Sequence, residues 1–252
     1  MTHSSLQAHR PTRSVTNYSF NHIGGLAASH YELCKSLVMG GVFQRFPQLH
    51  MGFLEGGVTW AVSLLADLIG HWEKRNGEQI GRLDPAILDV DSLIETLREY
   101  GDGAVTGQLD RIRDHFTRTP GRPEVLDDFA AARFSSVDDI IAVFSERMYF
   151  GCEADDPLVG TATTTMKHRP VHLRPILGTD ISHWDAPVMN EVIVEAFELL
   201  EDGVIDAADF RAFTFENPVR LHTAANKDFF AGTVCEREVR RDLIASRAAP
   251  SS

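Results

Sequence analysis

The chain of 252 residues has few cysteines and no long hydrophobic run. Cys34, Cys152 and Cys235 form an odd, widely spaced set. Such a set fits reduced thiols better than a disulfide framework or a thiolate zinc site. No stretch approaches the roughly 18 uninterrupted apolar residues of a membrane span, and the first residues lack the apolar core of a secretory signal. We therefore expect a cytoplasmic protein with no membrane partner.

Positive charge is also scarce, because 24 Lys and Arg residues stand against 36 Asp and Glu residues, giving a formal net charge of -12. Nucleic acids and anionic membrane surfaces are bound through clustered Lys and Arg, so the balance predicts neither partner. The remaining composition, 43% hydrophobic and 24% charged, is that of a soluble globular protein. The length permits one large α/β domain or two small domains.

Several motifs that mark common enzyme classes are missing. The sequence contains no Gly-x-Gly-x-x-Gly run and no phosphate-binding loop, so it gives no support for a nucleotide cofactor. It also lacks the Gly-x-Ser-x-Gly elbow, which lowers the expectation of a serine hydrolase.

Four short runs rich in β-branched, aromatic or aliphatic residues predict strands at 15–20, 49–54, 147–151 and 173–178. Each run is followed by a turn containing glycine or acidic residues. An amphipathic pattern at 27–38 predicts a helix between the first two strands, and this order is typical of a parallel sheet. The sequence therefore predicts the α/β fold class.

Helical patterns predominate in the rest of the chain. One helix is predicted from residue 57 to about 75, and a helical insertion covers about 84–145, with segments at 91–100, 103–116, 124–134 and 137–146. Asp91, Ser135 and Ser136 are plausible caps of these segments. A long loop is expected at 158–169, a helix at 187–200 and another helix near Asp206. Residues 1–14 are expected to be a flexible lead-in, 15–231 the domain, and 232–252 a polar tail.

Imidazole and carboxylate groups follow the predicted strands: His22, Glu55, Glu153, and Asp180 with His183. The carboxyl ends of parallel strands lie at one rim, so these groups could converge there. Imidazole nitrogen and carboxylate oxygen suit a divalent metal such as zinc, which can activate water. Simpler interpretations remain open, since a histidine after a strand is often a turn residue and acidic turn residues often cap helices.

Several segments carry a resemblance to a known family: NHIG at 21–24, GGVFQRFPQLHMGFLEGGVTW at 40–60, LIGHWEKRN at 68–76, YFGCEADDP at 149–157, ILGTDISHWD at 176–185 and ENPVRL at 216–221. With them the chain resembles the amidohydrolase-related superfamily, in particular the aminocarboxymuconate-semialdehyde decarboxylase-like metal-dependent hydrolases. The resemblance implies the C-terminal half of a TIM-type (β/α)8 barrel, strands five to eight, with a helical insertion.

The resemblance also implies roles for individual residues. His22 matches a metal ligand at the end of strand five, and Asp180 matches the aspartate that contacts the metal or its water and transfers a proton. Glu55 occupies a position where decarboxylase-like members usually have histidine, and it is expected to be catalytic. His183 and Trp184 would line the substrate pocket. Glu153 is assigned to substrate binding with them.

The largest departure from this family is the absence of a His-x-His pair, which supplies two metal ligands after strand one. Strands one to four have no counterpart here. The resemblance implies hydrolysis of a small amide, ester or lactone, with non-oxidative decarboxylation of a small aromatic or unsaturated acid as the alternative. A different possibility is a non-catalytic remnant or assembly module. We expect the chain alone to bind a divalent metal, with zinc as the first choice, weakly and to have little or no activity. We also expect it to pair with a complementing N-terminal half or with a second copy.

Overall fold

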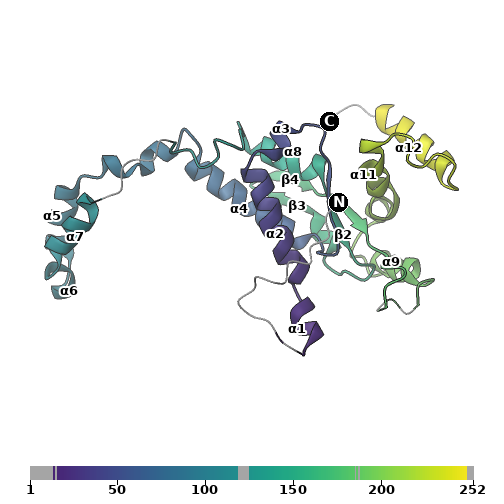
Figure 1. Ribbon diagram of the computed structural model, residues 1–252, viewed down its shortest axis with the longest axis horizontal. Helices are drawn as coiled ribbons and strands as arrows, with labels where there is room; N and C mark the ends of the chain where they lie inside the picture. The colour runs from purple at the N-terminus through teal and green to yellow at the C-terminus, as the bar shows by residue number, and fades with distance from the viewer. Residues whose placement is uncertain (1–13, 15, 119–124, 185, 187, 249–252) are drawn as a thin grey trace. The chain divides into compact units, whose positions relative to one another are not determined.

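The computed structural model describes residues 14, 16–118, 125–184, 186 and 188–248 (Figure 1). The chain divides into two compact units. The first unit consists of residues 1–69 and 134–252, and the second of residues 70–133. The described helices include none whose length and hydrophobicity would allow it to traverse a lipid bilayer.

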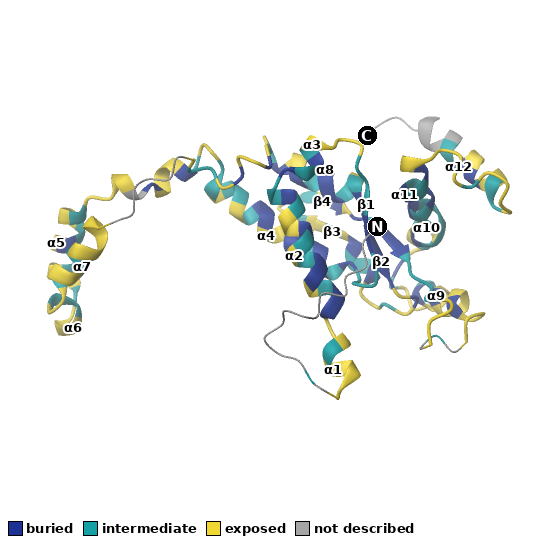
Figure 2. Ribbon diagram, in the orientation of Figure 1, coloured by how far each residue is buried: buried dark blue, intermediate teal, exposed yellow. Residues whose placement is uncertain are grey.

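A three-stranded parallel sheet forms the centre of the first unit. Its strands are β1 (Met51–Phe53), β2 (Met148–Cys152) and β5 (Pro175–Leu177), in the order β1-β2-β5. Phe150 lies opposite Phe53 in β1 and opposite Pro175 in β5. All five residues of the central strand β2 are buried, as Figure 2 shows. Three predicted strands and the α/β class are therefore confirmed.

The two faces of the sheet are covered by different helices. On one face, Phe53, Phe150 and Trp60 pack together with ring centroids 5.2 to 6.2 Å apart. Trp60 belongs to α4 (Thr59–Arg75), and His30 of α2 (Gly25–Met39) contacts the rings of Phe53 and Trp60. Because neighbouring strand residues point to opposite faces, Tyr149 lies on the other side with Ile176 and Leu221 of α11 (Asn217–Ala225). The sheet thus has a core on each face (Figure 1).

The strand predicted at 15–20 is wrong. Residues Tyr18–His22 form the short helix α1, and Val15 lies outside the described residues. The Asn17 side chain accepts a hydrogen bond from the backbone N–H of Phe20 at 2.9 Å, which is the geometry of a helix N-cap. No residue of α1 is buried, so its apolar side chains do not have the environment that stabilises a central strand. His22 therefore ends an exposed helix and not a strand.

The loop predicted at 158–169 contains regular structure. A short 3-10 helix, Val159–Ala162, leads into an antiparallel hairpin of β3 (Thr163–Met166) and β4 (Arg169–His172). Lys167 and His168 turn the chain with φ angles of 50° and 67°, without the glycine that usually marks such a turn.

The second unit is helical. It contains the 3-10 helices η2 (Ile80–Leu83) and η3 (Pro85–Ile87), followed by α5 (Val90–Tyr100), α6 (Gly103–Thr106) and α7 (Leu109–Thr117). Asp89, and not the predicted Asp91, caps α5 through its side chain. The helix predicted at 124–134 is wrong, because residues 125–134 form turns and irregular structure; Glu124 is outside the described residues.

The helix α8 (Val137–Arg147) belongs to the first unit, although the predicted insertion extended to 145. Ser136 caps this helix, as predicted, by accepting from the backbone of Asp139, whose side chain accepts from Ser136 in return. This reciprocal pair is a capping box. It begins α8, which runs directly into β2.

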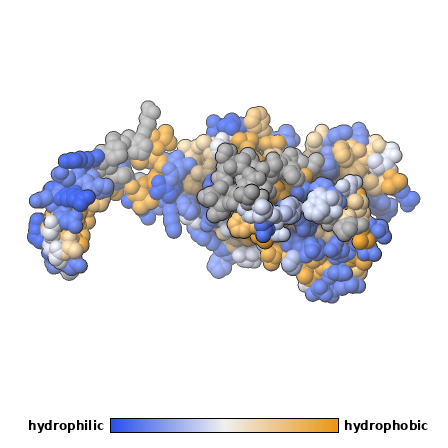
Figure 3. All heavy atoms as spheres, turned by 60° about the horizontal axis from the view of Figure 1, so that its bottom comes forward, coloured by the Kyte–Doolittle hydropathy of each residue, from blue (hydrophilic) through white to orange (hydrophobic). Residues whose placement is uncertain are grey.

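The C-terminal part of the first unit is mostly helical. It contains α9 (Val192–Glu201), α10 (Ala207–Arg211), the π-helix η5 (Ala212–Glu216) and α12 (Glu236–Ala248). Earlier in the chain, the short helix α3 (Val42–Arg45) follows α2. The helix near Asp206 was predicted, and Asp206 caps it. The segment 232–252, predicted as a polar tail, contains α12. On the face drawn in Figure 3, hydrophobic and hydrophilic residues are interspersed.

Candidate metal centre

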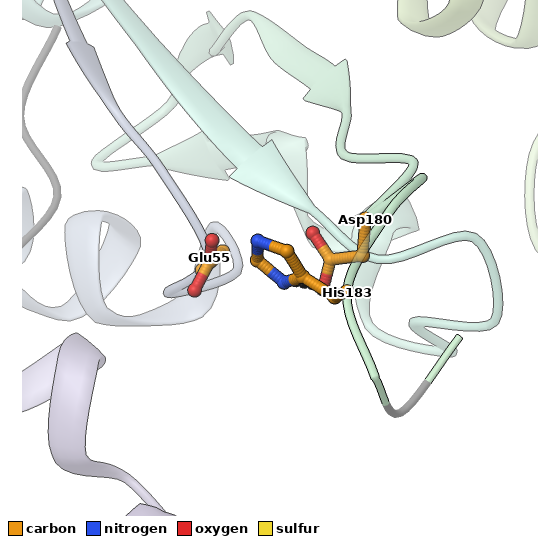
Figure 4. A group of neighbouring side chains, drawn as sticks. All are labelled: Glu55, Asp180 and His183. Atoms are coloured by element: carbon orange, nitrogen blue, oxygen red, sulfur yellow. Dashed lines mark ion pairs between the residues drawn. The ribbon is translucent and has the colours of Figure 1, made fainter. Parts of the chain in front are cut away.

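Three predicted site residues come together at the carboxyl edge of the sheet (Figure 4). Glu55 follows β1, and Asp180 and His183 follow β5. One ligand atom from each of the three side chains lies within 4.8 Å of the other two. The imidazole Nδ1 of His183 is 3.8 Å from a carboxylate oxygen of Asp180. Two turns that are separated by more than a hundred residues in sequence thus contribute to one cluster.

The backbone at this cluster adopts an unusual conformation. Glu55 has a φ of 60° and Asp180 a φ of 46°, both in the left-handed region. Residues other than glycine occupy this region at a cost of about 1–3 kcal/mol, and such residues concentrate at functional sites. Both carboxylates therefore depend on the surrounding structure to hold their turns in place.

Close contact between β1 and β2 supports the Glu55 turn. The backbone N–H of Gly57, whose φ is 66°, donates to the carbonyl of Gly151 at 3.0 Å. A Cβ added at Gly151 would lie 2.9 Å from the Cα of Leu54 and 3.0 Å from the backbone nitrogen of Glu55. Only glycine at position 151 permits this approach. Gly151 and Gly57 therefore together fix the position of the Glu55 turn.

Two neighbouring hollows open beside the cluster, with volumes of about 470 and 350 Å³. Asp180 lines the larger hollow and Glu55 the smaller one, while Glu153 and Asp155 line both. No Lys or Arg is among the described residues that line either hollow. The candidate site is therefore strongly acidic.

Glu153 responds to this acidic environment. Partial desolvation of its carboxyl group raises its pKa above the ordinary value of 4.5, and the negative charges of Asp155 and Asp180 raise it further. The His22 imidazole acts in the opposite direction. Glu153 thus holds a proton to a higher pH than an isolated glutamate does.

His22 lies beside this cluster but not in it. It lines the smaller hollow with Glu55, whereas the group of three neighbouring ligand atoms is formed by Glu55, Asp180 and His183. The ring of His22 stacks on Tyr18 at 5.1 Å, and Tyr18 contacts Trp184 edge-on at 5.7 Å. His22 was expected at the end of a strand. It lies instead at the end of α1, where its ring stacks on Tyr18.

The donor set of the cluster fits a divalent cation. Two carboxylates and one imidazole supply three ligands, the number that catalytic zinc sites usually take from the protein. Other divalent metals also accept oxygen and nitrogen ligands, so the set alone does not select zinc. Of the three residues, only Asp180 was expected from the sequence to bind metal.

One buried residue, His30, lies next to the site. His30 lies within α2 and has no exposed surface, and its Nε2 is 2.6 Å from the carbonyl oxygen of Leu54. Its burial could be predicted, because Leu26, His30 and Cys34 recur at a spacing of four residues on one helix face. Its contact with the residue before Glu55 could not, since 24 positions separate the two partners.

Comparison with family models, curated proteins and solved structures finds no match to this chain. The family resemblance consequently rests on the sequence motifs described above.

Proposed function

We propose that the chain is the C-terminal half of a metal-dependent hydrolase of the amidohydrolase-related superfamily, acting on a small amide, ester or lactone. The observation that carries this proposal is the convergence of Glu55, Asp180 and His183 at the carboxyl edge of a parallel sheet. In TIM-type barrels the active site lies at this edge. The strands β1, β2 and β5 would correspond to strands six to eight of the barrel.

Glu55, Asp180 and His183 would hold the metal, with zinc as the first choice. When bound, a divalent cation would polarise the substrate carbonyl and lower the pKa of an attacking water. The pKa of Glu153 is raised, and the negative charge of Asp180 contributes to this shift. A carboxyl group with a raised pKa suits proton transfer to a leaving group.

The electrostatics of the two hollows favour hydrolysis over decarboxylation. The substrate of a decarboxylase carries a carboxylate, which Asp155, Glu191 and Glu195, acidic residues of the larger hollow that are not among the three metal ligands, would repel. An uncharged amide, ester or lactone has no such cost. A non-catalytic assembly module would not need the three metal ligands Glu55, Asp180 and His183. Metal binding therefore distinguishes the hydrolase from such a module.

Metal titration with matched variants tests the proposal. Calorimetric titration of the whole chain with Zn²⁺ or Co²⁺ should show one site, and the weak affinity expected of half a barrel is still measurable. Asp180→Asn and His183→Ala should each weaken binding by at least about 10-fold, because even residues outside the ligand shell often contribute that much. Asp110→Asn and His115→Ala make the same chemical changes on exposed helical positions of the second unit and should leave affinity unchanged.

Either of two results would refute the metal centre. One is that the wild-type chain binds no divalent cation. The other is that Asp180→Asn and His183→Ala bind the cation as tightly as the two control variants do.

A further inference from the structure

The buried imidazole of His30 contacts the backbone at the foot of the metal centre. Its Nε2 is 2.6 Å from the carbonyl oxygen of Leu54, the residue that precedes Glu55. A carbonyl oxygen can only accept, so Nε2 carries a proton and donates it. The helix α2 is thereby joined to the last residue before the Glu55 turn.

The surroundings of His30 hold its ring in one place. The ring centroid lies 5.6 Å from that of Phe53 and 5.8 Å from that of Trp60. On the side of the turn, a Cβ added to Gly56 would lie only 2.7 Å from His30 Cδ2 and 3.1 Å from Trp60 Nε1. The imidazole therefore packs directly against the backbone that follows Glu55.

The Glu55 turn is held from two directions. On one side, Gly57 donates to Gly151 in β2, and on the other side Leu54 accepts from His30. Glu55 lies between these two hydrogen bonds with a φ of 60°. A left-handed glutamate persists only where its neighbours hold it, and these two bonds supply that restraint.

We propose that His30 is a positioning residue of the metal centre: its hydrogen bond to Leu54 keeps the Glu55 turn left-handed and so directs the carboxylate toward Asp180 and His183. The structural part of this proposal concerns the turn alone. Its consequence for metal binding rests on the proposed function.

Three variants of the whole chain separate this role from general stability. His30→Leu removes the donor but keeps an apolar side chain, whereas His30→Gln retains an N–H at a position comparable to Nε2. Cys34→Ala is the control, because Cys34 is equally buried one helical turn further along α2 and its sulfur contacts Met148 instead of the turn. Amide hydrogen exchange at Gly57 reports the turn, and exchange at Phe150, which donates to Arg174, reports the sheet.

In His30→Leu, we expect Gly57 to exchange about tenfold faster relative to Phe150, as the loss of one buried hydrogen bond implies. His30→Gln should restore the wild-type ratio, and Cys34→Ala should change both amides together. With Co²⁺ as the probe, His30→Leu should bind about 10-fold more weakly or worse and His30→Gln near the wild-type affinity.

The proposal is overturned if the Gly57 to Phe150 ratio in His30→Leu equals that in Cys34→Ala, or if a folded His30→Gln behaves like His30→Leu. If His30→Leu does not fold, His30→Asn replaces it, since asparagine is too short to place an N–H where Nε2 lies. A wild-type chain that binds no Co²⁺ would refute the metal centre, while the exchange ratio would still decide the role of His30.

Discussion

At the scale of single residues, the candidate site depends on carboxylates placed close together. Glu55, Glu153, Asp155 and Asp180 line two adjoining hollows with no described Lys or Arg between them. The negative charges of Asp155 and Asp180 disfavour the ionised form of Glu153, in addition to the effect of its partial desolvation. If the proposed cation binds here, it should reduce this repulsion and so stabilise the folded chain.

Glu153 should make the stability of the chain depend on pH. Its pKa is raised in the folded state, so the folded chain binds a proton more tightly than the unfolded chain, and stability falls as pH rises above about 4.5. Glu153→Gln removes this effect. We expect the variant to be more stable than the wild type at pH 7.5 and to lose that advantage by pH 4.

Urea unfolding of both proteins at the two pH values measures this difference. Glu238→Gln is a suitable control, because Glu238 pairs with Arg241 on the exposed face of α12. An advantage of Glu153→Gln that is equal at both pH values would contradict the assigned cause.

At the scale of secondary structure elements, the contact between β1 and β2 is a sensitive point. In Gly151→Ala, the new Cβ would lie 2.9 Å from Leu54 Cα, so one strand must shift. We expect a loss of roughly 1–3 kcal/mol in the free energy of unfolding, which is typical of overpacking. Gly70→Ala in α4 meets no atom within 4 Å and should stabilise by up to about 1 kcal/mol. Chemical denaturation of both variants checks the opposite signs.

The capping box of α8 provides a second test. Ser136→Ala removes the side chain that accepts from Asp139 and should cost about 1 kcal/mol. Ser135→Ala changes the neighbouring serine, whose backbone N–H still reaches Asp139. We expect the midpoint of urea unfolding to fall for Ser136→Ala alone. Equal midpoints for the two variants would show that the cap contributes little.

Three strands could be predicted because their apolar runs end at glycine or acidic turns, and these patterns directly reflect burial. The segment 15–20 has the composition of a strand, but the local cap at Asn17 and the lack of burial decide for a helix. The hairpin β3–β4 was missed because its Thr-rich strand is largely exposed and its turn lacks glycine. Composition alone does not report such tertiary effects.

The candidate site could likewise be predicted only in part. Glu55, Asp180 and His183 could be singled out because each follows a predictable strand, and strand ends share one edge. Their convergence at one rim was anticipated, but the backbone that brings His183 back toward Glu55, with positive φ at Asp180 and Ser182, could not be predicted. The resemblance implies that His22 is a metal ligand at the end of strand five, whereas Tyr18–His22 form a helix.

At the scale of the whole molecule, the two compact units should unfold with some independence. Ile94 is buried in α5 of the second unit, so Ile94→Ala should destabilise that unit by about 2–5 kcal/mol. Hydrogen exchange should quicken in α5 and remain unchanged at Phe150 in β2.

Leu64→Ala in α4 is the reciprocal variant, because Leu64 is buried in the first unit. It should quicken exchange at Phe150 and spare α5. A uniform change across both units in either variant would indicate a single cooperative structure.

The order of the strands also determines when the sheet can form during protein synthesis. Met51 of β1 pairs with Met148 of β2, and the entire second unit is encoded between them. At typical elongation rates, β1 would wait roughly 5–20 s on the ribosome before its partner is made. The uninterrupted second unit can fold during that interval, whereas the cluster of Glu55, Asp180 and His183 cannot form before β5 and the turn after it are made. The β1 segment of the nascent chain therefore stays without its partner strand until β2 has been made.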